Sequence, residues 1–219
     1  MSVSPEGSSR GYHSPRRLAA ARETRARIRD AAGRLFLADG YAPTSIRTIA
    51  KAAGVAEKTV YLQFANKPAL LKEVVETAIV GDDQKIAAHD RPWFREILAD
   101  PDPAAKIRLL VGATAALHER TGAYFMMARG AAAVDAEAAD LWAYGKRGHR
   151  TDMTLLAESF EAAGMLPPGR DARWAMTVLY ALVGPETWHL LRVELGADPA
   201  AYEEWLHATL ENTFDVDRR

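Results

Sequence analysis

Five hydrogen-bonding or charged side chains lie close together between residues 57 and 63: Glu57, Lys58, Thr59, Tyr61 and Gln63. The carboxylate of Glu57 can accept a hydrogen bond from cytosine N4, and the ammonium of Lys58 can donate to guanine O6 or N7. We therefore predict that Glu57 and Lys58 set a preference for particular base pairs. This chemistry requires a rigid element that presents the side chains to a DNA groove.

The residues around this run have the pattern of two short helices joined by a glycine. The first has its apolar face at Ile46, Ile49, Ala50 and Ala53, and the second has Val60 and Phe64 on its inward face. Gly54 separates the two helices, and Val55 returns the chain to the core. This is the plan of a helix-turn-helix, whose second helix enters the major groove. The sequence therefore predicts DNA binding.

The charge distribution supports this interpretation. The net charge is −1, but residues 1–72 hold 13 Lys and Arg against 5 Asp and Glu, and the remainder holds 15 against 24. A basic segment suits a polyphosphate, because neutralised phosphates release counterions. A solvated charged surface would give the same counts, and the helix-turn-helix in the same segment favours DNA.

Composition excludes several classes of protein. The chain has 219 residues, of which 48% are hydrophobic, so a sizeable core is possible. No apolar run approaches the roughly 20 residues that cross a bilayer, and residues 1–22 lack the apolar segment of a signal peptide. The chain has no cysteine, which excludes disulfides, thiol redox sensing and cysteine-ligated zinc. We expect a cytoplasmic protein that does not associate with membranes.

The rest of the chain reads as helix, which predicts an all-α fold. Residues 1–15 are rich in Ser, Gly and Pro, and we assign residues 1–21 to a disordered basic arm that either reaches a minor groove or is a solubilising tail. The first helix is expected from Arg16 or Arg22 to Asp39, and the second after a cap at Thr44 or Ser45. The third is expected after Ala56, and the fourth after a cap at Asn66, with its end near Ala88. Further helices are expected at Pro103–Arg120, Gly122–Ala133, Asp135–Ala163, Asp171–Val183, Pro185–Leu195 and Pro199–Phe214.

Residues 24–76 resemble the DNA-binding domain of the TetR family of bacterial transcriptional regulators. The resemblance rests on Ala32, Leu35, Phe36, Gly40, Tyr41, Thr44, Ser45, Ile49, Ala50, Gly54, Val55, Thr59, Tyr61, Phe64, Asn66, Lys67, Leu70 and Leu71. The C-terminal part resembles the family more loosely, in its number of helices and its closing helix pair. The implied division is a helix-turn-helix domain at residues 22–68 and a helical effector-binding and dimerisation domain at residues 69–219.

The resemblance implies a function and a mechanism. A homodimer would offer one helix-turn-helix to each half-site of a palindromic operator and would act as a repressor. A small-molecule effector in the second domain would move the fourth helix and release the DNA. No cofactor is implied.

The resemblance also implies roles for individual residues. Thr59 and Tyr61 match positions that contact DNA, commonly at phosphates, and Lys67 matches a phosphate-contacting lysine at the start of the fourth helix. Thr44 and Ser45 match the phosphate-contacting start of the second helix. Arg47 aligns with a position where some members place an arginine on a guanine edge, and Gln63 with a more variable position. Ala56 departs from the Ser or Thr that often caps the recognition helix.

Aromatic and methionine side chains are concentrated in the second domain and predict a pocket for a moderately hydrophobic effector. The candidate pocket residues are His118, Phe125, Met126, Arg129, Trp142, His149, Met153, Met176 and Tyr180. Core packing or surface exposure is the alternative for each. The resemblance implies that the dimer forms through the last long helices, with candidates Trp174, Val178, Leu182, Trp188, Leu191, Trp205, Leu206 and Leu210.

Two other hypotheses fit parts of the sequence. Glu186-x-x-His189 and Glu204-x-x-His207 are half the ligand set of a di-iron carboxylate enzyme, but no clear second bridging glutamate completes it. A helical adaptor that has lost DNA binding is the third possibility. The presence of Thr59, Tyr61 and Lys67 favours a regulator that binds DNA over both, and thus a protein that is not an enzyme.

Overall fold

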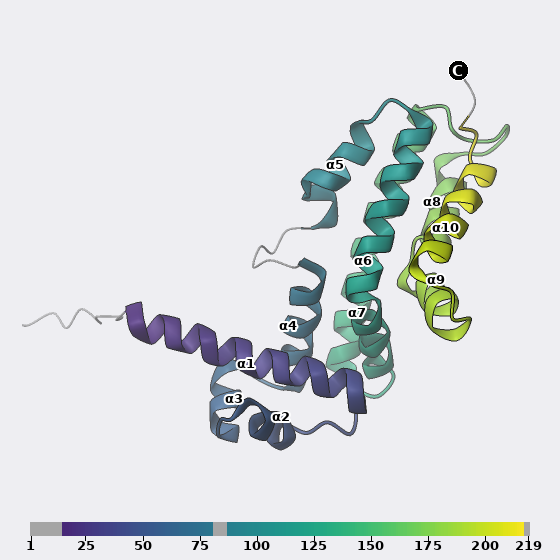
Figure 1. The fold of residues 1–219 in the computed structure, drawn as a ribbon. Helices are drawn as coiled ribbons and strands as arrows, with labels where there is room; N and C mark the ends of the chain where they lie inside the picture. The colour runs from purple at the N-terminus through teal and green to yellow at the C-terminus, as the bar shows by residue number, and fades with distance from the viewer. Residues whose placement is uncertain (1–14, 81–86, 217–219) are drawn as a thin grey trace, which may run out of the picture.

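The computed structural model describes residues 15–80 and 87–216, and in these residues every regular element is helical (Figure 1). The N-terminal domain contains α1 (Pro15–Asp39), α2 (Ile46–Ala53), α3 (Glu57–Gln63) and α4 (Lys67–Val80). The predicted division assigns most of α4 to the second domain, and we group it with α1 to α3 because its Leu70 and Leu71 lie in their core. The second domain contains η1 (Ala88–Asp90), α5 (Pro92–Ala99), α6 (Pro103–Ala132), α7 (Ala136–Ala162), α8 (Ala172–Leu182), α9 (Pro185–His189), the π-helical η2 (Leu190–Glu194) and α10 (Pro199–Thr213). The all-α prediction is confirmed.

The first helix begins at Pro15, close to the earlier of the two predicted starts. Proline is suited to a first turn, because its fixed φ is helical and its missing N–H would have no partner there. Residues 15–21, which the predicted division assigns to the arm, therefore lie in α1. Residues 1–14 of the arm lie outside the described residues.

The turn between α2 and α3 forms as the sequence predicts. Ser45 caps α2, and its hydroxyl oxygen accepts a 3.1 Å hydrogen bond from the backbone of Thr48. Gly54 ends α2 with φ of 66°, a left-handed conformation that disfavours residues with a Cβ. Ala56 precedes α3 without a side-chain cap, as expected from its methyl group.

Residues 103–132 form one continuous helix, so the predicted break near Gly122 is wrong. Gly122 lies under the indole of Trp188, and a Cβ there would approach the ring carbons to 2.3 Å. The glycine therefore permits close helix packing instead of ending a helix. The indole Nε1 also donates a 3.0 Å hydrogen bond to Glu119, one turn earlier on α6.

The segment after α4 contains elements that the periodicity did not predict. The helix α4 is described as far as Val80, residues 81–86 lie outside the described residues, and η1 and α5 follow. The buried side chains of Phe94 and Ile97 hold α5 to the core. Lys106 of α6 is buried, and its ammonium donates to the carbonyls of Ile97 and Leu98 at 3.0 and 2.7 Å.

Two hydrophobic cores organise the molecule. One contains apolar residues of α5 to α10, including Leu156, Phe160 and Leu206. The other is built from α1 to α4, and it also includes Ala128 and Ala131 of α6 and Ala138 of α7. The end of α6 and the start of α7 therefore belong to the core of the N-terminal domain. None of the helices in residues 15–80 and 87–216 is both long and apolar enough to span a membrane.

Candidate DNA-binding surface and effector site

The helix α3 presents a polar outer face above an apolar inner one. Val60 and Phe64 are buried, whereas Lys58 is exposed and Tyr61 is 54% exposed. Thr59 and Gln63 are half-buried at the edges of this face. Leu62, which the sequence analysis did not single out, is 74% exposed and adds an apolar group of the kind that contacts thymine methyls.

Arg47 and Glu57, two of the predicted base-reading residues, contact each other. The Arg47 Nε donates a 2.9 Å hydrogen bond to Glu57 Oε1, and this bond raises the pKa of Arg47. The Arg47 side chain is 85% exposed. The carboxylate at the start of α3 thus orients a guanidinium that comes from α2, and the two side chains form one unit on the outer surface.

Thr44 and Ser45 have different surroundings, although both were predicted to contact phosphate. Thr44 is 3% exposed, and its hydroxyl donates a 2.7 Å hydrogen bond to the carbonyl of Gly40. Ser45 is exposed at the N-terminus of α2. The Thr44 hydroxyl is therefore turned into the protein, where it supports the loop before α2, and Ser45 is the better placed of the two for a phosphate.

Lys67 lies at the start of α4, as the sequence predicts. Its ammonium is 4.1 Å from the centroid of the Tyr41 ring and donates to the carbonyl of Ala42 at 3.3 Å. Burial lowers the pKa of Lys67. The Asn66 side chain accepts from the backbone of Ala69 at 2.8 Å, which confirms the predicted cap.

Arg25 of α1 braces the helix-turn-helix from behind, a role that sequence reasoning missed. Its Nε donates a 2.8 Å hydrogen bond to Glu73 of α4, and its guanidinium also bonds the backbone carbonyl of Gln63. The guanidinium carbon lies 4.1 Å from the centroid of the Phe64 ring. Arg25 and Glu73 are 48 positions apart, so no local pattern pairs them.

The start of α7 docks directly on the N-terminal domain. The Tyr41 hydroxyl donates to Asp135 at 2.8 Å, and the Asn66 amide donates to Glu137 at 2.7 Å. Asp135 also caps α7 by accepting from the backbone of Ala138 at 3.1 Å. These contacts connect the loop before α2 and the start of α4 to the second domain.

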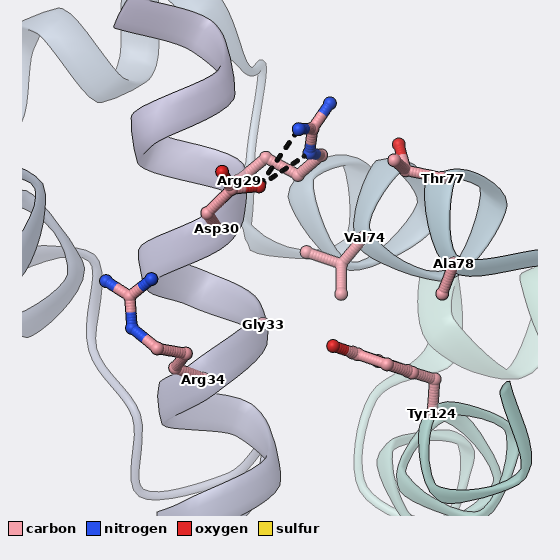
Figure 2. A pocket seen from close by; sticks show the side chains of 8 residues that line it. All are labelled: Arg29, Asp30, Gly33, Arg34, Val74, Thr77, Ala78 and Tyr124. Carbon is pink, nitrogen blue, oxygen red and sulfur yellow. Dashed lines mark hydrogen bonds and ion pairs between the residues drawn. The ribbon is translucent and has the colours of Figure 1, made fainter. Parts of the chain in front are cut away.

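An open pocket of about 310 Å³ lies where α1, α4 and α6 meet (Figure 2). It is lined by Arg29, Asp30, Gly33, Arg34, Val74, Thr77, Ala78 and Tyr124. The Tyr124 ring extends from α6 toward Gly33 of α1 (Figure 2). The pocket therefore lies at the junction between the domains.

A second group of polar residues comes from α6, α7, α8 and α9. We call His118, Lys146, His149, Tyr180 and Glu186 the polar cluster. The Lys146 ammonium donates to Glu186 at 2.8 Å and lies 4.5 Å from the Tyr180 ring centroid. The rings of His149 and Tyr180 are 4.8 Å apart.

Both histidines of the polar cluster are neutral at physiological pH. Burial is the main cause that lowers the pKa of His118 and of His149 to about 4, and the charge of Lys146 lowers that of His149 further. The Nδ1 atom of His118 and the Nε2 atom of His149 are buried and make no hydrogen bond within the described residues. Buried nitrogens of this kind are normally paired, so they mark a place where a polar group can be received.

Comparison with known proteins identifies the N-terminal domain. Residues 28–74 match the model of a family described as bacterial regulatory proteins, tetR family. This domain is a TetR-family domain. No curated protein matches the chain.

Several solved structures share the whole TetR-like arrangement. NalD, the secondary repressor of the MexAB-OprM multidrug efflux pump in Pseudomonas aeruginosa, is 24% identical with a TM-score of 0.69, over 91% of this chain and 100% of NalD. A SmeT–triclosan complex is 20% identical with a TM-score of 0.68, over 89% and 93% of the two chains. A regulator from Saccharomonospora viridis in complex with choline is 20% identical with a TM-score of 0.66, over 90% and 100%. At these identities the likeness is one of fold.

The predicted effector residues of this TetR-like protein fall into two groups. His118, His149 and Tyr180 meet in the polar cluster, with Trp142 5.6 Å from the Lys146 ammonium and Arg129 acting on Glu186 through its charge. The others lie elsewhere. Phe125 packs against the N-terminal core, and Met126 is half-buried on α6. Met153 lies in the core formed by α5 to α10, and Met176 packs against that core. Lys146 was missed, and Glu186 was considered only as a metal ligand.

The candidate interface residues also divide. Trp188 of α9 is buried against Gly122 of α6. Leu206 and Leu210 are buried because positions 202, 206 and 210 share the inward face of α10. These three side chains therefore pack in the core of the protomer. Trp174, Val178, Leu182 and Leu191 are half-buried and Trp205 is exposed, so these five stay candidates for the interface.

The two Glu-x-x-His motifs do not converge. Glu186 pairs with Lys146, and the His207 Nδ1 lies 3.3 Å from Glu211 on the same helix. Among the residues that the structure describes, no three His, Asp or Glu side chains gather as metal ligands would. The di-iron hypothesis thus has no support from the geometry.

Proposed function

We propose that this protein is a dimeric repressor of transcription that binds a palindromic operator and is released by a small-molecule effector. The observation that carries the proposal is the outer face of α3, which holds Lys58 and Tyr61 exposed on a domain of the TetR family. The basic N-terminal third of the chain supports the same conclusion, because it suits a polyphosphate.

In the proposed complex, each recognition helix enters one major groove, and the two lie about 34–36 Å apart, one turn of DNA. Ser45, Thr59, Tyr61 and Lys67 contact phosphates and fix the register. The bases are read by Arg47, Glu57, Lys58 and Gln63. The partner subunit is held through apolar side chains of α8, η2 and α10 that the core covers only in part or not at all: Trp174, Val178, Leu182, Leu191 and Trp205.

The polar cluster is the proposed effector site, and α7 is the proposed connection to the DNA. Lys146 and His149 are on α7, and the same helix is capped by Asp135, which is bonded to Tyr41 of the DNA-binding domain. An effector that binds the protein more tightly with α7 in one position than in another favours the first conformation. The difference between the two affinities sets how far the equilibrium between the conformations shifts. Two of the similar structures are complexes with small organic molecules, triclosan and choline, which supports a small-molecule effector.

DNase footprinting of DNA that flanks the protein's own gene tests the proposal. We expect a protected site with two-fold symmetry, which the Tyr61→Ala variant fails to protect at the same concentration. Tyr144→Ala is the matched control, because Tyr144 is an exposed tyrosine of the second domain. Unprotected DNA, or protection without any symmetric site, would contradict a dimeric repressor.

A further inference from the structure

The ion pair of the polar cluster has the composition of an ammonium-binding site. Glu186 accepts a 2.8 Å hydrogen bond from the Lys146 ammonium, whose nitrogen lies 4.5 Å from the ring centroid of Tyr180 and 5.6 Å from that of Trp142. A carboxylate and the faces of aromatic rings are the groups that proteins use to bind organic cations. The protein's own lysine thus occupies a position that suits the ammonium of a ligand.

The neighbouring imidazoles add hydrogen-bond acceptors. One ring nitrogen of His149 is hydrogen-bonded to the backbone of Tyr180 and carries the proton of the neutral ring. The other nitrogen, the buried Nε2, therefore has a free lone pair and no partner within the described residues. The Nδ1 of His118, a residue only 3% exposed, has no partner within the described residues either. An N–H group of a bound ammonium can therefore donate to an imidazole nitrogen that no protein group uses.

The two members of the ion pair differ in the length of their side chains. Glu186 is in the first turn of α9, next to Pro185, so a short side chain on a fixed backbone holds its carboxylate. The Lys146 ammonium is on a longer, flexible four-carbon stem, and both side chains are partly exposed, at 24% for Lys146 and 35% for Glu186. A ligand is therefore expected to replace the lysine and keep the glutamate. Arg129, which is exposed, also acts on Glu186 through its charge.

We infer that the effector site of this protein takes a protonated amine with an aromatic or other apolar group, whose ammonium displaces Lys146 from Glu186. This inference rests on the proposed function, since it names the class of effector. A carboxylic acid of the same shape would need Lys146 and would place its own negative charge next to Glu186. The site therefore favours the amine over the acid.

Isothermal titration of the full chain without DNA tests the inference, with phenethylamine, phenylacetate and phenethyl alcohol as matched probes. We expect phenethylamine to bind most tightly. Glu186→Gln should weaken its binding by about tenfold or more, as expected for the loss of a charge-assisted hydrogen bond. Lys146→Met should strengthen binding, because it removes the competing ammonium, and Tyr180→Leu should weaken it. Glu158→Gln, the same change at an exposed position of α7, should have no effect.

Three results would overturn the inference: tighter binding of phenylacetate than of phenethylamine, unchanged amine binding in Glu186→Gln, or no heat of binding with any probe. Circular dichroism of each variant verifies that it is folded. The expected increase in amine affinity of Lys146→Met is a further control, because an unfolded protein would bind less tightly and not more. The footprint separates the two proposals. A symmetric footprint without amine binding overturns the effector class alone, and amine binding without a footprint overturns the repressor alone.

Discussion

The hydroxyl of Tyr41 donates a 2.8 Å hydrogen bond to the carboxylate of Asp135, which joins the loop before α2 to the first turn of α7. Burial and this hydrogen bond raise the pKa of Tyr41, and bonds from the backbone of Ala138 and from Tyr41 lower that of Asp135. Because Asp135 also caps α7, a movement of that helix changes a bond to the DNA-binding domain. The proposed effector signal therefore has a short route that runs along α7.

Removing this bond should uncouple the two domains. Tyr41→Phe keeps the ring beneath Lys67 and deletes only the hydroxyl, so we expect a loss of about 1 kcal/mol in the free energy of unfolding. Operator affinity without effector should change little, whereas the effector should release the DNA less completely. Urea unfolding and anisotropy titrations measure both effects. Tyr144→Phe is the control, and a Tyr41→Phe protein that releases DNA as fully as the native chain would exclude this route.

The contact between Glu57 and Arg47 should determine base preference. Glu57→Gln weakens the hold on the Arg47 guanidinium, and we expect the preferred base pair at one position of each half-site to change. Discrimination at a base pair read by one bidentate side chain is worth about 1–3 kcal/mol. Binding to a library of half-site variants measures this preference. An unchanged preference after replacement of both Glu57 and Lys58 would show that neither side chain reads a base.

Tyr61 should contribute to affinity without contributing to the fold. Its side chain is mostly exposed on α3, so Tyr61→Ala should weaken binding to all DNA sequences and leave the unfolding midpoint almost unchanged. Anisotropy on operator and on random DNA, together with thermal unfolding, measures the two quantities. Normal DNA affinity of this variant would contradict the placement of α3 in the groove.

Lys67 should account for about one phosphate contact. We expect Lys67→Ala to reduce the slope of log affinity against log salt by about one unit. Lys72→Ala, which removes an exposed lysine farther along α4, is the matched control. An identical slope for the native chain and Lys67→Ala would show that the ammonium stays on Tyr41 when DNA is bound.

The buried histidines should make the protein sensitive to acid. Burial lowers the pKa of His118 and His149 to about 4 from 6.5. Between these values the unfolded chain binds two protons that the folded protein does not, so stability is lost as the pH falls through this window and is unaffected above it. The loss is at most about 3 kcal/mol for each histidine. Urea midpoints across this range should vary less in a His118→Gln, His149→Gln double variant, and an equal dependence would refute the assignment.

The DNA-binding domain could be predicted because its signals are local. The apolar positions of α2 and α3, the left-handed Gly54 and the Asn66 cap all act within a few residues. Gly122 misled because a glycine that permits packing against Trp188 looks the same in sequence as one that ends a helix. The pairs Arg25–Glu73 and Lys146–Glu186 were missed because they join residues 48 and 40 positions apart, which only the tertiary fold brings together.

The most direct test of the central claim is fluorescence anisotropy of the purified protein on DNA flanking its own gene, across a salt series. A DNA-binding regulator should bind tightly, lose affinity linearly in log salt, and keep its binding in an excess of unrelated DNA. Equal affinity for the flanking and the unrelated DNA at every salt concentration would contradict the claim that this protein recognises an operator there.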